Sequence, residues 1–189
     1  RPVECRLAVV DEPRLEGDWV VAESGAEPCP GCGIVLPSVP GTPHRYMTAS
    51  VACWAGYGEL LAAQYADRSR MEYHQLVVDA YAVQHPGGVL PEQVQSVGIH
   101  LMTLALFIED GTDPALGTSL HRKMVARPLF HYLPPPSSRG ELTYANVPRG
   151  GPVNEARSAA YAWAACVWAA WGEHHSTVDL WLRESGLRL

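Results

Sequence analysis

The sequence predicts a mainly α-helical protein: a helical bundle of about four long helices with an N-terminal zinc-knuckle loop and short extended segments. Long stretches carry apolar side chains at helical spacing, several of them begin at a capping residue or a proline, and Pro- and Gly-rich connections separate them. The chain has 189 residues, 47% of them hydrophobic and 18% charged. We therefore expect a single domain over 1–189 that buries a substantial core.

The elements before residue 90 begin with two extended segments, at 4–10 and 19–22. A loop rich in Pro, Gly, Ser and Thr follows over 28–48. Ser50 is expected to cap the first helix, which runs to about residue 66. The second helix covers roughly 70–85, and the His-Pro-Gly-Gly sequence at 85–88 ends it.

Pro91 opens the third helix, which extends to about residue 110, because proline is tolerated at the first helical position. A short helix is expected at 117–126. Residues 127–153 form a Pro- and Gly-rich loop. Asn154 is expected to cap one long C-terminal helix that ends at residue 186. The single domain thus divides into an extended and knuckle segment (1–48), helices (49–126), a loop (127–153) and this last helix (154–186).

Composition and missing motifs exclude several classes of protein. The net charge of -6 disfavours nucleic-acid binding, which needs clustered Lys and Arg. The sequence has no apolar run of about 18 residues and no signal-peptide pattern, so we expect no membrane span and a cytoplasmic location. It also lacks G-x-S-x-G, the Walker loop, G-x-G-x-x-G and H-E-x-x-H.

The sequence Cys29-Pro-Gly-Cys32-Gly has the local pattern of a zinc knuckle, in which two thiolates face one cation. Cys53 falls in the first turn of the helix that Ser50 caps, where a thiolate is favoured. A structural zinc needs a fourth ligand, for which there are two candidates. His44 lies in the same loop; His85 lies level with Cys53 if the first two helices are antiparallel.

A second site is expected among the long helices. His74 and His85 lie on one stripe of the second helix but stand ~16 Å apart along it, so one ion cannot bind both. His100 of the third helix lies near the level of His74 if these helices are also antiparallel. One of His174 and His175, from the last helix, would complete a three-histidine site.

This histidine site would hold a second divalent metal or act through acid and base groups. His74, His100 and His174 are its candidate metal ligands. The candidate catalytic residues are His74, Asp79, Tyr81, His100 and His175, in which Asp79 orients an imidazole or acts as a base and Tyr81 supports the site.

Several motifs together resemble an uncharacterised bacterial domain-of-unknown-function family. They are the CPGCG sequence, the stretch from Ala49 to Glu59, DAYAVQHP at 79–86, the stretch from Gln95 to Leu101, and the WxxHH motif that ends at His175. The resemblance spans residues 28 to about 182 and implies no reaction. At the level of the fold, the chain is also similar to DinB-like bundles, which hold a metal with three histidines.

From these residues we expect a zinc-binding helical-bundle enzyme that acts on a small molecule by hydrolysis, thiol transfer or isomerisation. Secondary metabolism is a plausible setting for such a bacterial protein. One alternative is a non-catalytic, zinc-stabilised module that binds a protein partner through the 127–153 loop. The other is a thiol or metal sensor that acts through Cys29 and Cys32.

Overall fold

The structure is a computed structural model that describes residues 25–125 and 130–189. The fold is mainly α-helical, as the sequence predicts. The α-helices in the described ranges are α1 (Val51–Tyr65), α2 (His74–Gln84), α3 (Pro91–Ile108), α4 (Gly117–Val125), α5 (Val153–Ala170) and α6 (His175–Glu184). Short 3-10 segments cover Arg68–Tyr73, Pro114–Leu116, Tyr144–Asn146 and Gly172–His174. The extended segments expected at 4–10 and 19–22 lie outside the described residues.

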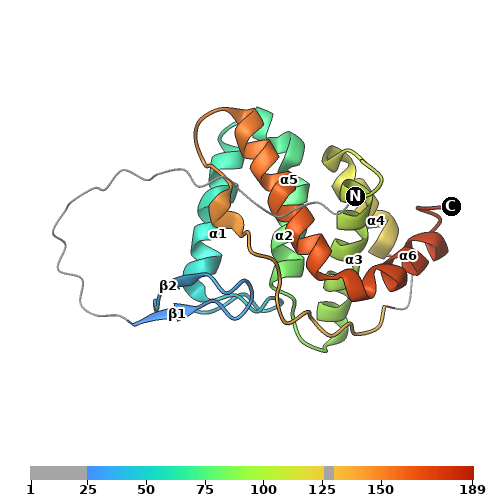
Figure 1. Cartoon of the computed structure of the whole chain (residues 1–189), viewed down its shortest axis with the longest axis horizontal. Coiled ribbons are helices and arrows are strands. Elements are labelled where there is room, and N and C mark those ends of the chain that lie inside the picture. Colours follow the sequence, from blue (N-terminus) through green and yellow to red (C-terminus); the bar gives the residue numbers. More distant parts are fainter. Residues whose placement is uncertain (1–24, 126–129) are drawn as a thin grey trace.

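A small antiparallel hairpin of β1 (Ala26–Pro28) and β2 (Val35–Pro37) precedes the helices. It lies beside one end of α1 (Figure 1). The turn of the hairpin is the CPGCG sequence. Its backbone closes with hydrogen bonds from Cys29 N to Ile34 O (2.8 Å) and from Gly33 N to Cys29 O (2.9 Å). Gly33 has a φ of 77°, which glycine adopts without strain.

Helices α1 and α3 begin at the residues that the sequence predicts. The Ser50 hydroxyl accepts a hydrogen bond from Cys53 N (3.2 Å) at the start of α1. Pro91 is the first residue of α3. The second predicted helix is regular only from His74, because residues 68–73 form a 3-10 turn that Asp67 caps.

Helix α2 lies at the centre of the molecule and packs against both α3 and α5 (Figure 1). Eight of its eleven residues are buried, including Asp79 and Gln84. The largest fully buried side chains surround this helix and include Trp163, Trp171, Tyr73, Phe107, Leu101 and Met102. The hydrophobic core is therefore arranged around α2, so polar groups on this helix must find partners inside the protein.

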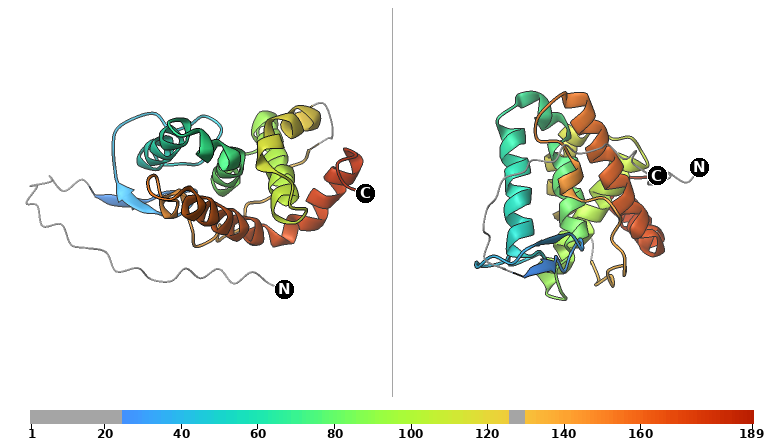
Figure 2. Two further views of the ribbon diagram at one scale, coloured as in Figure 1. Left: turned by 90° about the horizontal axis from the view of Figure 1, so that it is seen from above. Right: turned by 60° about the vertical axis from the view of Figure 1, so that its left-hand side comes forward.

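The prediction of one long C-terminal helix from 154 to 186 is wrong. Helix α5 begins at Val153, directly after Pro152, and ends at Ala170. A 3-10 turn over Gly172–His174 follows, and α6 then runs in a different direction from α5 (Figure 2). Gly172 has low helix propensity at this point. The indole of Trp171 is also anchored in the core, where it donates to Val83 O (3.1 Å). The bend lets α5 cover α2 while α6 packs against α3.

The Pro- and Gly-rich loop is an irregular segment, as expected, over its described residues 130–152, apart from the turn at Tyr144–Asn146. The buried amide of Gln84 holds it by donating to Arg139 O (3.0 Å) and Leu142 O (2.8 Å). Among the helices in the described ranges, we find none with the length and apolar character needed to cross a membrane. A single domain over the whole chain stays a prediction.

Candidate metal centre

The knuckle brings Cys29 and Cys32 to the tip of the hairpin. Cys29 is buried, and its Sγ accepts a hydrogen bond from the backbone N–H of Ser50 (3.3 Å). Gly31, between the two cysteines, lies against His85. A Cβ on Gly31 would stand only 2.7 Å from the carbonyl oxygen of Thr48 and would collide with the His85 ring. Glycine is therefore required here by close packing of the knuckle on the end of α2.

Two helices contribute the other members of the cluster. Cys53 lies in the first turn of α1, and His85 is the C-cap of α2. Thr48 joins the loop to this end of α2, because its N–H donates to His85 O (3.2 Å) and its hydroxyl to Pro86 O (2.8 Å). The antiparallel arrangement expected from the sequence places His85 beside Cys53, with Nε2 of the ring 3.3 Å from Sγ.

The cluster of Cys29, Cys32, Cys53 and His85 has the size of a tetrahedral metal site. Each residue offers one ligand atom, and these atoms all lie within 4.8 Å of one another. Sγ of Cys32 lies 3.8 Å from Sγ of Cys53. Zinc–sulfur bonds of about 2.3 Å at tetrahedral angles put two sulfurs about 3.8 Å apart. This cluster of cysteines and histidine could hold a metal ion.

Neighbouring groups complement a cluster of negative thiolates. The Tyr81 hydroxyl lies 3.4 Å from Cys53 Sγ, where it can donate a hydrogen bond to sulfur. The Arg139 guanidinium reaches over from the loop and donates through Nη1 to the carbonyls of Pro30 (2.9 Å) and Gly31 (2.8 Å). Its positive charge therefore lies beside the knuckle, and it fixes the backbone between the two cysteines.

Without a metal ion, the three thiols share protons unequally. Hydrogen bonds from Cys32 and then Cys53 lower the pKa of Cys29. The hydrogen bond to Cys29 raises the pKa of Cys32 to about 11 and also raises the pKa of Cys53. These hydrogen bonds therefore favour deprotonation at Cys29 over Cys32 and Cys53.

The choice of fourth ligand, left open by the sequence, falls on His85 in this arrangement. His44 lies outside the cluster: its Nδ1 accepts from Tyr46 N (3.3 Å), and its ring lies 4.5 Å from the Trp54 ring, centre to centre. The reason is that the loop turns away after the knuckle, whereas the end of α2 is held against it. Cys32 is half-buried, while the other three members are buried.

A second group of candidate ligands combines Asp79 of α2, His100 of α3 and His121 of α4. Oδ1 of Asp79 lies 2.6 Å from Nδ1 of His100 and 3.1 Å from Nε2 of His121. Burial raises the pKa of Asp79, but the hydrogen bonds from both histidines outweigh it, and the net pKa is lowered. The two histidines thus favour the charged form of the Asp79 carboxyl inside the core.

His121 is not among the residues predicted for the second site. Its position was nonetheless predictable from register, because α4 folds back on α3 after a turn near Gly111. That turn puts His121 opposite Thr103, whose hydroxyl lies 3.2 Å from Nε2 of the histidine, and one helical turn from His100.

His74 does not take part in this second group. It is the first residue of α2, and its ring faces α1, with Nδ1 2.8 Å from Oε1 of Gln64 and Nε2 3.3 Å from the Tyr65 hydroxyl. Asp79, five residues later, lies roughly 140° further around the helix. His74 and His85 therefore both face α1, at its two ends, while Asp79 faces α3. Burial lowers the pKa of His74.

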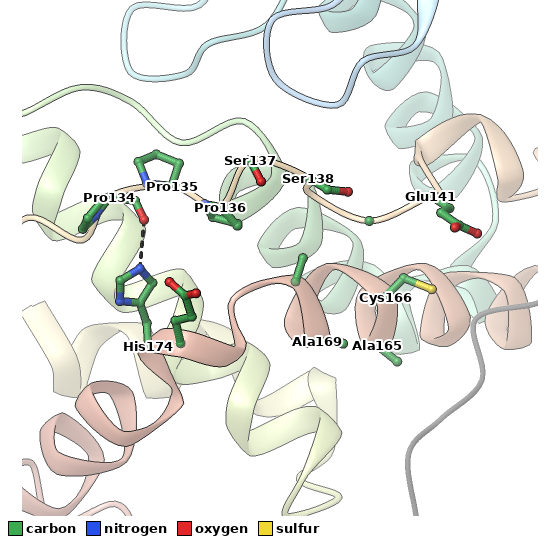
Figure 3. A pocket seen from close by; sticks show the side chains of 13 residues that line it. Pro134, Pro135, Pro136, Ser137, Ser138, Glu141, Ala165, Cys166, Ala169 and His174 are labelled. Carbon is green, nitrogen blue, oxygen red and sulfur yellow. Dashed lines mark hydrogen bonds between the residues drawn. The ribbon is translucent and has the colours of Figure 1, made fainter.

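His174 and His175 also lie outside both groups, because the bend between α5 and α6 turns them away from α2. The His175 ring stacks on Trp168 at 3.8 Å, and its Nε2 donates to Trp168 O (2.9 Å). His174 donates to Pro134 O (2.8 Å) at the edge of a groove of about 590 Å³ between the prolines of the loop and α5 (Figure 3). His174 alone among the predicted site residues lines this groove.

Comparison with known proteins gives the chain a family. The model of a family of unknown function, DUF5946, matches residues 27–172. The chain belongs to this family. No curated protein and no solved structure matches.

The DUF5946 match contains all four members of the cysteine cluster and all three members of the Asp79 group, but ends before His174 and His175. Membership of DUF5946 confirms the resemblance to an uncharacterised family. It gives no reaction, and the likeness to DinB-like bundles stays a prediction.

Proposed function

We propose that Cys29, Cys32, Cys53 and His85 hold a structural zinc ion that joins the N-terminal knuckle to the helical bundle. The observation that carries the proposal is the convergence of three sulfurs and one imidazole nitrogen within 4.8 Å. Three cysteines and one histidine form one of the standard ligand sets of structural zinc sites. The chain supplies all four ligands, so no position is left for a substrate.

The closed ligand set favours a structural ion over a sensor or a catalytic centre. A sensor would need cysteines that solvent and oxidants reach, but Cys29 is 2% exposed and Cys53 is fully buried. Only Cys32 is partly accessible among the three. A zinc ion here would link β1–β2, α1 and α2, which are distant in sequence.

The proposal is tested by the metal content of protein purified without a histidine tag, measured by mass spectrometry for the wild type and for Cys29→Ser and His85→Gln. We expect zinc bound at this site in the wild type and its loss in both variants. His44→Gln is the matched control, because it removes an imidazole from the same loop but no member of the cluster.

Two results would refute the structural zinc. One is a wild-type protein that holds no zinc even though it was never exposed to a chelator. The other is a Cys29→Ser variant that retains it. Loss of zinc in His44→Gln but not in His85→Gln would instead assign the fourth ligand to the loop.

Catalysis on a small molecule is a separate function that stays a prediction. The histidine site expected for it needed His74, His100 and one of His174 and His175 at one place. Those side chains have different partners, on α1, α2 and the loop or α5. The same holds for partner binding through the 127–153 loop, whose described part packs on α2 and the knuckle.

A further inference from the structure

We infer that Asp79, His100 and His121 form a second metal site, for a divalent transition-metal ion, separate from the cysteine cluster. The three residues come from three different helices, and their ligand atoms lie within 4.8 Å of one another. Two histidines and one carboxylate are a common ligand set for such ions. The inference goes beyond the structural zinc and does not depend on it.

The hydrogen bonding of Asp79 is uneven. Oδ1 has three partners: Nε2 of Gln75 at 2.9 Å, Nδ1 of His100 at 2.6 Å and Nε2 of His121 at 3.1 Å. Oδ2 is buried and has no hydrogen-bond partner. A fully buried carboxylate oxygen without a partner is costly. A bound cation would offset that cost, because it interacts with the whole carboxylate and with the imidazole nitrogens.

The two imidazole rings are placed to share an ion with the carboxylate. Their centres lie 5.0 Å apart, and the ring planes make an angle of 77°. At tetrahedral angles, ligand atoms on an ion with bonds of about 2.1 Å stand roughly 3.4 Å apart. Oδ1 of Asp79 lies 3.1 Å from Nε2 of His121 and 2.6 Å from Nδ1 of His100, so binding of an ion moves the His121 ring back by about 0.3 Å and the His100 ring by about 0.8 Å.

The site formed by Asp79, His100 and His121 should prefer different metal ions from the cysteine cluster, because its ligand atoms differ. All three ligand atoms are nitrogen or oxygen, so the site suits ions that accept imidazole and carboxylate without thiolate. The side chains of His100 and His121 are 15% and 21% exposed, whereas Asp79 is fully buried. Three protein ligands leave positions on the ion open, and the histidine side gives solvent access to them.

The test uses Zn²⁺ and Co²⁺ as probes on the full chain. We would dialyse wild type, His100→Gln and His121→Gln against Zn²⁺ and count bound ions by mass spectrometry, then repeat with Co²⁺ and record absorption. Cobalt bound by cysteines shows a thiolate-to-metal charge-transfer band, whereas cobalt at a nitrogen and oxygen site shows only weak d–d bands. His174→Gln is the control for zinc picked up by surface histidines.

We expect two zinc ions per wild-type chain and one in each of the two variants, with affinity at the second site reduced on the order of 100-fold or more. Cys29→Ser should keep the second ion and its d–d bands but lose the charge-transfer band, so failure of either site is recognised separately. A thermal melt of each variant shows that it is folded. A wild type that binds no ion outside the cysteine cluster, variants that keep both ions, or loss of the second ion in His174→Gln would overturn the site.

Discussion

The two ring nitrogens of His85 have separate partners. Nδ1 lies 2.8 Å from the carbonyl oxygen of Tyr81, so Nδ1 carries the proton and donates it. Nε2, the other ring nitrogen, lies 3.3 Å from Sγ of Cys53. This hydrogen bond to the backbone is the usual device that orients a metal-binding histidine and fixes its tautomer. His85 is thus prepared as a ligand by the last turn of α2 itself.

Tyr81 was expected to support a catalytic site, which stays a prediction; its side chain lies beside the cysteine cluster. Its hydroxyl lies 3.4 Å from Cys53 Sγ, and its ring stacks on Tyr57 at 3.7 Å and on His85 at 4.0 Å. In Tyr81→Phe the rings stay stacked, but the sulfur loses a donor. We expect zinc affinity to fall about 10-fold with the fold retained. Competition with a chromophoric chelator measures the change.

Tyr57→Phe is the matched control for this prediction, because it removes a hydroxyl from the neighbouring ring of the same stack. Its zinc affinity should stay within about twofold of wild type. Equal losses in both variants would mean that the affinity reports packing of the rings; an unchanged Tyr81→Phe would mean that the hydroxyl does not act on the sulfur.

Much of the cysteine cluster was predictable because its signals are local. The spacing of Cys29 and Cys32 and the cap at Ser50 before Cys53 depend on turn and helix geometry alone. His85 needed one further step, the antiparallel pairing of two helices. The Asp79 group needed three helices in register, and an assumed straight C-terminal helix directed attention to His174 and His175.

At the scale of elements, the irregular loop over 130–152 acts as a strap between α2 and the knuckle. The side-chain amide of Gln84 donates to two backbone carbonyls of this loop, and its oxygen accepts a hydrogen bond from the indole of Trp163 (3.0 Å). Arg139 extends from it to the carbonyls of Pro30 and Gly31. The strap therefore holds the backbone of the knuckle to α2 through Arg139 and Gln84.

Arg139→Gln should loosen this connection. Two hydrogen bonds from a charged, half-buried donor are lost, and we expect the free energy of unfolding to fall by about 1–3 kcal/mol. Amide hydrogen exchange should quicken at 29–33. Denaturant titration and exchange mass spectrometry measure the two effects.

Arg149→Gln serves as the control for Arg139→Gln. Arg149 makes an exposed ion pair with Glu59 at 3.4 Å, which should contribute less than about 1 kcal/mol. If Arg139→Gln matched this small effect and left exchange at the knuckle unchanged, the strap would have no part in holding it.

The C-terminal bend shows where sequence patterns stop being informative. Apolar residues recur at helical spacing through Trp171 and on to Leu182, so periodicity alone gives one helix. The break depends on Gly172 together with a buried indole hydrogen bond to α2, and the second of these is a tertiary contact. The low helix propensity of Gly172 favours a break only weakly, so the sequence alone does not predict the end of the helix at this position.

At the scale of the whole molecule, the cysteine cluster lies at one end of the hydrophobic core, of which Cys29 and Cys53 are members. The cluster lies where the hairpin meets the ends of α1 and α2 (Figure 1), whereas Trp163, Phe107 and Leu101, which are among the largest fully buried side chains, come from α3 and α5. The helices hold one another through apolar packing, whereas the hairpin is two strands of three residues each. A hairpin of this size is not stable by itself in water.

Removal of zinc should therefore release one end of the molecule and leave the rest folded. We expect a strong chelator to preserve most of the helical circular dichroism, because most of the apolar contacts among α2, α3 and α5 are made by side chains that are not ligands of the metal. The unfolding temperature should fall by several degrees, as roughly 1 kcal/mol corresponds to 2–4 °C in a chain of this length. Hydrogen exchange should increase mainly over 26–53 and around Arg139.

Cys29→Ser supplies the control for chelation: its exchange pattern should already match that of the chelated wild type, and chelator should change it little. Collapse of the helical signal on chelation would contradict this division of the molecule, since it would make the bundle itself dependent on the ion, as in small zinc fingers. Unchanged exchange over 26–53 would mean that packing of Gly31 and Thr48 against the end of α2, with Arg139, suffices to hold the hairpin without metal.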